Sequence, residues 1–99
     1  SINQTPVQFS QEVQLSKPLE PYLIDVSGAK SATISASAED RWSAVVRILD
    51  KDLNLLDEKQ TSKPVNSLKV SLPQNAKYIM IDDAVSLENI KRGLKIYLE

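Results

Sequence analysis

Hydrophobic and polar residues alternate along much of the chain. In the segment 31–38, alanine and isoleucine occupy the even positions, while serine and threonine occupy the odd ones. Segments 68–72 and 94–98 show the same period of two, with an aliphatic residue at every second position. Successive side chains of a β-strand point to opposite faces, so each segment is predicted to be a strand with one face on a core.

The first quarter of the chain carries two shorter patterns of the same kind. Between residues 7 and 15 the apolar residues share one parity, which Gln11 interrupts. We expect a bulge or a bend at Gln11, and we place Phe9 in the core. A second apolar set occupies positions 22, 24 and 26, and Tyr22 is likewise placed in the core.

Two segments, 41–49 and 77–82, are apolar on both parities. Val45 in the first and Ile79 in the second add an apolar residue to the other face. This pattern is typical of central strands that are covered on both faces, or of strands whose second face meets a partner.

Turn-forming residues separate these segments. Pro18 and Pro21 flank one turn, residues 27–30 form a tight connection, and Asp50–Lys51–Asp52 favours a hairpin. About eight short strands at regular spacing predict an all-β fold, an antiparallel β-sandwich, which occupies residues 1–99 as a single domain. A five-stranded oligonucleotide-binding barrel is the alternative fold for this length.

One segment has helical character. Ser86 is a suitable N-cap, and Gly93 is suited to end a helix, so a short helical turn is predicted near residues 86–92. It has fewer than two turns, and we interpret it as a crossover before the last strand.

Composition narrows the function mainly by exclusion. The 99 residues include no Cys, no His and only two Gly, which removes disulfides, Cys/His zinc sites, histidine bases and glycine-rich phosphate loops. Twelve basic and 13 acidic residues nearly balance, which argues against nucleic-acid binding. The apolar runs are too short to span a membrane. The chain begins Ser1-Ile2 without Met, so we expect either a processed mature protein or a domain of a longer one.

Asp50, Asp52 and Asn54 fit the alternating oxygen ligands of a calcium-binding loop. However, Leu55 stands where such a loop needs Gly, and Thr61 stands where it needs Glu. Asp and Asn are also common in hairpin turns, and we favour a turn over a calcium site here. Calcium is the one cofactor that the sequence suggests.

Two further charged patterns have ordinary explanations. The acidic pairs Glu39-Asp40 and Asp82-Asp83 are expected to be solvated loop residues rather than catalytic carboxylates. Five basic residues would form an anion-binding patch only if their strands are neighbours, and we favour a solvated face. These residues are Arg41, Arg47, Lys91, Arg92 and Lys95.

Aromatic side chains supply the candidate contact residues, which are Tyr97, Trp42 and Tyr78. Tyr97 alternates with the aliphatic residues around it and is therefore expected to point outward from a flat sheet. There it can stack on a sugar ring or anchor a protein partner, although a surface cross-strand contact is the simpler interpretation. Trp42 is expected at the rim of the core.

The strand order resembles that of bacterial pre-peptidase C-terminal domains. The resemblance rests on Glu20–Val26, Gly28 and Ser31–Ser35, then on the hairpin Ala44–Leu56 and on Lys77–Ile81, and it spans roughly residues 7–82. The same order is similar to the maltose-operon periplasmic protein family. Asn75-Ala76 departs from the pattern, because a Gly usually precedes the aromatic strand. The resemblance implies a non-catalytic, jelly-roll-like sandwich in the periplasm or outside the cell.

We therefore expect a non-enzymatic binding or accessory module of an extracytoplasmic bacterial system, with carbohydrate or a protein as its partner. A structural domain that packs on copies of itself or on a larger scaffold is the alternative, and self-association stays open. A hydrolase that uses carboxylates alone is a minor third hypothesis.

Overall fold

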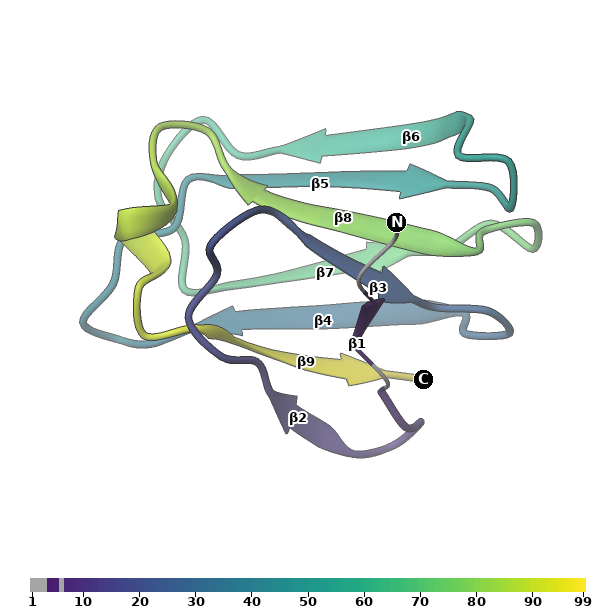
Figure 1. Ribbon diagram of the computed structural model, residues 1–99, viewed down its shortest axis with the longest axis horizontal. Helices are drawn as coiled ribbons and strands as arrows, with labels where there is room; N and C mark the ends of the chain where they lie inside the picture. Colours follow the sequence, from purple (N-terminus) through teal and green to yellow (C-terminus); the bar gives the residue numbers. More distant parts are fainter. Residues whose placement is uncertain (1–3, 6) are drawn as a thin grey trace.

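The chain forms two stacked β-sheets (Figure 1). The computed structural model describes residues 4–5 and 7–99. The strands are β1 (Gln4–Thr5), β2 (Glu12–Gln14), β3 (Tyr22–Asp25), β4 (Ser31–Ala36), β5 (Ala44–Leu49), β6 (Leu55–Gln60), β7 (Ser67–Ser71), β8 (Tyr78–Asp83) and β9 (Leu94–Leu98). One sheet has the order β1-β3-β8-β5-β6, and the other has the order β2-β9-β4-β7.

The connectivity from β2 to β9 is that of a jelly roll. Every connection in this stretch crosses between the sheets, except the β5–β6 hairpin. All pairings between these strands are antiparallel apart from the two-residue β1, which runs parallel to β3. An isolated bridge between Phe9 and Leu98 is also parallel. The predicted antiparallel, jelly-roll-like sandwich is therefore confirmed, and the barrel alternative is wrong because the strands form two separate sheets.

The core lies between the sheets and follows the alternation seen in the sequence. Ile34 of β4 and Ile96 of β9 lie side by side on adjacent strands, on the inner face of one sheet. Ile79 and Ile81 of β8 line the inner face of the other sheet, and all four side chains are fully buried. The apolar residues on the second parity of β5 point outward. Val45 is nevertheless only 5% exposed, because longer side chains on β6 and β8 flank it.

Phe9 departs from the prediction, since it is 47% exposed and not in the core. The chain turns at Ser10, which has a φ of 57°, and β2 begins at Glu12. The predicted bend at Gln11 is thus confirmed, but the parity on its two sides is not continuous. Phe9 lies outside the sandwich, where a Cβ on Gly28 would stand 3.7 Å from its ring.

A short 3-10 helix, η1 (Leu87–Ile90), connects β8 to β9 at the end of the molecule opposite the β5–β6 hairpin (Figure 1). The Ser86 hydroxyl accepts a hydrogen bond from the Glu88 backbone N–H at 3.1 Å, as the predicted N-cap requires. The helix is shorter than the predicted turn. In the described part of the chain, no helix is long and apolar enough to cross a membrane.

Asp83 organises this connection and is buried, contrary to the expected solvated acid. Its Oδ2 accepts from Ser43 N at 2.9 Å, and its Oδ1 accepts from Val85 N and Ser86 N at 2.9 and 3.0 Å. The Asn89 side-chain amide donates a further bond at 3.2 Å. Four N–H donors replace the hydration of the carboxylate, so its burial requires no cation.

Candidate functional site

The outer surface of the β2-β9-β4-β7 sheet is polar, and we call it the polar face. None of the large hydrophobic side chains that are exposed in the described residues lies on it. Its outward side chains are Glu12 and Gln14, Ser31, Thr33 and Ser35, Ser67, Lys69 and Ser71, and Lys95, Tyr97 and Glu99.

Tyr97 lies near the middle of the polar face. Its strand neighbours in register are Glu12 on β2 and Thr33 on β4, and Lys69 of β7 follows beyond Thr33. The ring is half-buried among polar side chains and points away from the core, as the alternation predicts. An aromatic ring held in a polar surface offers an apolar platform beside hydrogen-bonding groups.

A groove of about 480 Å³ adjoins Tyr97 along β9. It is lined by Glu12, Gln14, Ser35, Ala36, Ser37, Ala38, Arg92, Gly93 and Lys95. Lys95 precedes Tyr97 by two residues on the same face, a separation of about 7 Å along a strand. Tyr97 does not itself line the groove, and Lys95 lies between the groove and the ring on β9.

Gly93 and Gln14 fix the floor of this groove. Gly93 has a φ of 79°, and a Cβ there would collide with the carbonyl oxygen of Leu15. The Gln14 side-chain amide donates to Leu15 O at 2.8 Å and to Leu94 O at 3.3 Å, which ties β2 to the start of β9. A side chain larger than hydrogen at position 93 would push the two strands apart.

Carboxylates accompany the three cations of the polar face and groove. Lys95 Nζ lies 3.7 Å from Glu12 Oε1, and Lys69 Nζ lies 4.0 Å from Glu99 Oε1. At the groove wall, the Arg92 guanidinium donates to Asp40.

Arg92 is held by two acids from the β4–β5 loop. Besides its guanidinium contact, its backbone N–H donates to Asp40 Oδ2 at 3.2 Å, and Glu39 Oε2 lies 3.3 Å from its Nη2. Asp40 is only 7% exposed, which corrects the expectation of a solvated loop acid. Its desolvation is compensated by the paired guanidinium.

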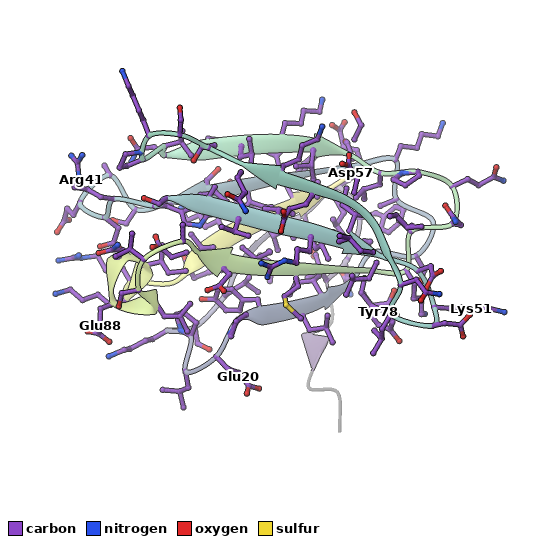
Figure 2. All side chains as sticks on the ribbon, turned by 90° about the horizontal axis from the view of Figure 1, so that it is seen from above. Glu20, Arg41, Lys51, Asp57, Tyr78 and Glu88 are labelled. Atoms are coloured by element: carbon purple, nitrogen blue, oxygen red, sulfur yellow. The ribbon has the colours of Figure 1, made fainter. Side chains whose placement is uncertain are left out.

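Tyr78 is located on the opposite sheet and at the hairpin end, close to Lys51 and far from Arg41 and Glu88 (Figure 2). Lys77 Nζ lies 5.6 Å from the centre of its ring and 2.8 Å from Asp25 Oδ2. Burial raises the pKa of Asp25, but hydrogen bonds from Lys77 and Ser27 outweigh this and lower it overall. The same bond to Asp25 raises the pKa of Lys77.

Trp42 is a core residue, which corrects its expected position at the rim and its place among the contact residues. Its side chain is fully buried, and its Nε1–H donates to Asp82 O at 2.9 Å. A surface ligand therefore does not reach the Trp42 ring in this conformation.

The three residues of the calcium motif form a hairpin turn. Asp50 Oδ1 accepts from Asp52 N and Asn54 N, both at 2.9 Å, and Oδ2 accepts from the Asn54 side-chain amide at 3.2 Å. These are the hydrogen bonds of an Asx-type turn, the interpretation that the sequence favours. Among the described residues, no group of three or more acids is placed to hold a metal ion.

The five basic residues do not form one patch. Arg47 lies on the β5 strand of the opposite sheet, where its Nε donates to Glu58 Oε1 at 2.7 Å. Arg92 and Lys95 line the groove on the other side of the molecule, each beside its own carboxylate.

The groove was not foreseen from the sequence. Gln14 and Leu94 are 80 positions apart, and only the pairing of β2 with β9 brings them together. The available signal was Gly93, whose hydrogen side chain marks a close approach of two backbones, but it was assigned to the end of a helix.

Comparison with known proteins gives no assignment, since no family model, curated protein or solved structure matches this chain. The class of protein is therefore defined by the fold alone, which is a jelly-roll β-sandwich.

Proposed function

We propose that this domain is a non-catalytic carbohydrate-binding module, an accessory part of an extracytoplasmic bacterial system. The observation that carries the proposal is Tyr97, a half-buried ring near the centre of a hydroxyl-rich face, with a groove beside it at Lys95. Sugar rings combine an apolar face with hydroxyls at the edge, which matches an aromatic platform surrounded by polar side chains.

The surroundings of Tyr97 favour a sugar over a protein partner on this face. Protein interfaces are centred on apolar anchors, whereas the neighbours of Tyr97 are Glu12, Thr33 and Lys95. A hydroxyl both donates and accepts hydrogen bonds, and the polar face presents both kinds of partner.

The non-catalytic part of the proposal is supported by the use of the buried acids. Asp83 binds four N–H donors, and Asp40 is paired with Arg92, so both carboxylates are engaged in holding loops. The periplasmic or secreted setting rests on the resemblance to pre-peptidase C-terminal domains and to the maltose-operon periplasmic family.

The test is a glycan array followed by titration of the best-binding oligosaccharide. Tyr97→Ala should weaken binding about tenfold or more, because it removes the stacking platform. Tyr78→Ala, on the opposite sheet, is the matched control and should bind like the wild type. The proposal fails if no glycan binds, or if Tyr97→Ala binds as tightly as the wild type.

A second candidate function is assembly with a protein partner or a second copy through the opposite sheet. The observation that favours it is an apolar strip near the hairpin, where Leu53 and Leu55 are 48% and 58% exposed. Leu55 pairs in register with Leu49, and Leu49 pairs in turn with Tyr78. Sedimentation of the wild type and of Leu55→Glu tests self-assembly. A concentration-independent monomer for the wild type contradicts it.

A further inference from the structure

We infer that the open edge of β7 is a docking site for an extended segment of a protein partner, which adds to the β2-β9-β4-β7 sheet as a further strand. The segment carries a basic and an acidic residue two positions apart, and their side chains face Asp57 and Lys59 of β6. This inference goes beyond the proposed function, because β7 is the edge of the sheet, whereas Tyr97 lies two strands away on β9.

Three of the four sheet edges in the described part of the chain are protected against strand addition. β1 and β2 have only two and three residues. β6 carries the inward charges Asp57 and Lys59, and its register with β5 shifts between Ile48 and Leu49. Short edge strands, inward charges and bulges are known devices that prevent pairing with another chain.

β7 differs from these edges. It has five residues, all in one regular register with β4. Its inward side chains, Leu68 and Val70, are apolar and pack in the core. The one charge of the strand, Lys69, is on the polar face, where its Nζ lies 4.0 Å from Glu99 Oε1. β7 is therefore the edge at which another strand is least hindered.

The hydrogen-bond pattern of β7 leaves alternate backbone groups available to a further strand. Directly after β7, Leu72 N donates to Lys30 O of the chain that leads into β4, at 2.8 Å. Bonded pairs alternate along an antiparallel ladder, so the even-numbered residues of β7 bond to β4. The N–H and C=O groups that point toward the open edge are therefore those of Ser67, Lys69 and Ser71.

The inner side of β6 is not covered by the other sheet. Residues 61–66 link β6 directly to β7, so the two strands border the same side of the sandwich. Asp57 and Lys59 point to the inner side of β6, yet their side chains are 49% and 52% exposed. The inward residues of the neighbouring strand β5 are fully buried. A strand added to β7 would therefore lie across from β6 and cover this inner side.

The charges of β6 determine which side chains suit the added strand. Asp57 and Lys59 form an ion pair at 3.5 Å in contact with water. Apolar residues would remove this pair from water without a new partner, which is costly. A basic residue across from Asp57 and an acidic one across from Lys59 replace the lost hydration, and alternate residues of a strand share a face. An antiparallel partner of β7 runs in the direction of β6, so its basic residue comes first (Figure 1).

A second copy of this chain does not supply such a segment from β6 or β7. If two β7 edges paired, the inward residues brought toward β6 would be Leu68 and Val70, which carry no charge. If β6 of a second copy paired with β7, it would bring Asp57 toward Asp57 and Lys59 toward Lys59. Like charges in this position are unfavourable. We therefore assign the β7 edge to a different protein.

The experiment titrates two end-blocked peptides into isotope-labelled protein and follows its backbone amide signals by nuclear magnetic resonance. The peptides are Val-Thr-Lys-Thr-Glu-Thr-Val and its neutral counterpart Val-Thr-Gln-Thr-Gln-Thr-Val. The charged peptide should shift the amides of Ser67, Lys69 and Ser71. It should bind about fivefold more tightly than the neutral one, the upper value for one exposed ion pair. The double substitution Asp57→Asn and Lys59→Gln should abolish this difference.

Lys69→Pro tests the edge itself. It removes an N–H that points toward the open edge and leaves the bonds to β4 in place, and Pro is tolerated at such a position of an edge strand. This variant should lose peptide binding. Lys69→Ala, which keeps the N–H, is the matched control and should bind like the wild type.

The inference is overturned if neither peptide shifts the β7 amides, if both bind equally well, or if Lys69→Pro binds as tightly as Lys69→Ala. A wild-type dimer that Lys69→Pro dissociates would also overturn it, because the occupant would then be a second copy. If Lys69→Pro does not fold by circular dichroism, the Asp57→Asn and Lys59→Gln variant decides, and a preference that survives in it contradicts the inference. None of these results bears on glycan binding, which the Tyr97→Ala titration tests separately.

Discussion

Individual polar side chains hold the turns of this sandwich, and Asp50 is the clearest example. Its carboxylate accepts three hydrogen bonds within the β5–β6 hairpin. These bonds also compensate a costly backbone conformation, because Leu53 in the same turn has a φ of 66°. A residue with a Cβ adopts this region at a cost of about 1–2 kcal/mol.

Replacement of Asp50 by Asn should make the stability of the domain less dependent on pH in the acid range. The hydrogen bond from the Asn54 backbone N–H lowers the pKa of Asp50. The Asn54 side-chain amide and the Asp52 backbone N–H lower it further by smaller amounts. A carboxyl whose folded pKa lies below its unfolded value of about 4 stabilises the protein above that pH. This stabilisation disappears as the pH falls through the folded pKa.

Urea unfolding at about pH 7 and at about pH 2.5 checks the effect, because these values bracket the pH range in which carboxyl groups titrate. Asp50→Asn should be less stable than the wild type at the higher pH, and the gap should shrink at the lower one. Asp52→Asn is the control, because the Asp52 carboxylate accepts no hydrogen bond among the described residues. An equal deficit at both values of pH would refute this account of Asp50.

At this scale the sequence predicted the residues whose environment is local. The hairpin chemistry of Asp50 and the outward direction of Tyr97 depend on near neighbours in the chain. Trp42 was misplaced because its hydrogen-bond partner is distant, since the indole reaches Asp82 O, 40 positions away. Asp83 was misplaced although three of its four donors are within six residues, because only the fourth, Ser43 N, connects it to a distant strand.

Among the elements, β6 shows how an edge strand is kept from pairing with another chain. Its Asp57 and Lys59 are exposed although they point to the inner side of the sheet, in register with Ile48 and Val46. The two side chains form an ion pair at 3.5 Å. Charges that point inward at a sheet edge are a known protection against strand addition.

The double substitution Asp57→Val and Lys59→Val should therefore promote self-association through the β6 edge. It replaces two inward charges with apolar, β-branched residues on an open edge. Sedimentation velocity at increasing concentration should show dimers or larger species for this variant. Gln60→Val, on the outward side of the same strand, should remain like the wild type.

A monomeric double variant that keeps its fold by circular dichroism would show that the β6 edge is protected by something other than these charges.

The helical turn shows how far the sequence could predict a whole element. Ser86 and Gly93 indicated its position, but η1 spans only Leu87–Ile90, after the Val85 and Ser86 N–H groups that donate to Asp83.

In the molecule as a whole, most strands pair with partners far away in the sequence. β2 pairs with β9, and β3 pairs with β8. The alternation of the chain was sufficient to predict two-layered β structure, because period two identifies strands with one buried face. The order of strands in each sheet could not be predicted, because strands that share the same alternation of inward and outward residues can pair in any order.

This topology has a kinetic and a thermodynamic consequence that Trp42 can report. The only tryptophan is fully buried between the sheets, so its fluorescence follows the core. Urea unfolding followed by Trp42 emission and by far-ultraviolet circular dichroism should give coincident transitions. Refolding should take milliseconds to seconds, because non-local pairings must form first.

Transitions that separate by probe would show that the two sheets do not unfold as one unit. Trp42→Phe, followed by circular dichroism alone, controls for the probe itself. It should be less stable than the wild type, because it loses the hydrogen bond to Asp82 O and leaves part of the indole volume empty.

The contact between Asp40 and Arg92 finally constrains how this protein can diverge. The two residues are 52 positions apart, and one of them is almost completely shielded from water. Loss of Arg92 alone leaves the buried carboxylate of Asp40 without its cation, a costly intermediate for a small domain. Loss of Asp40 alone is milder, because Arg92 is partly exposed and keeps Glu39 as a partner. In any lineage that descends from this sequence, position 92 should therefore not change before position 40, and that order of change would mark its relatives where overall similarity has faded.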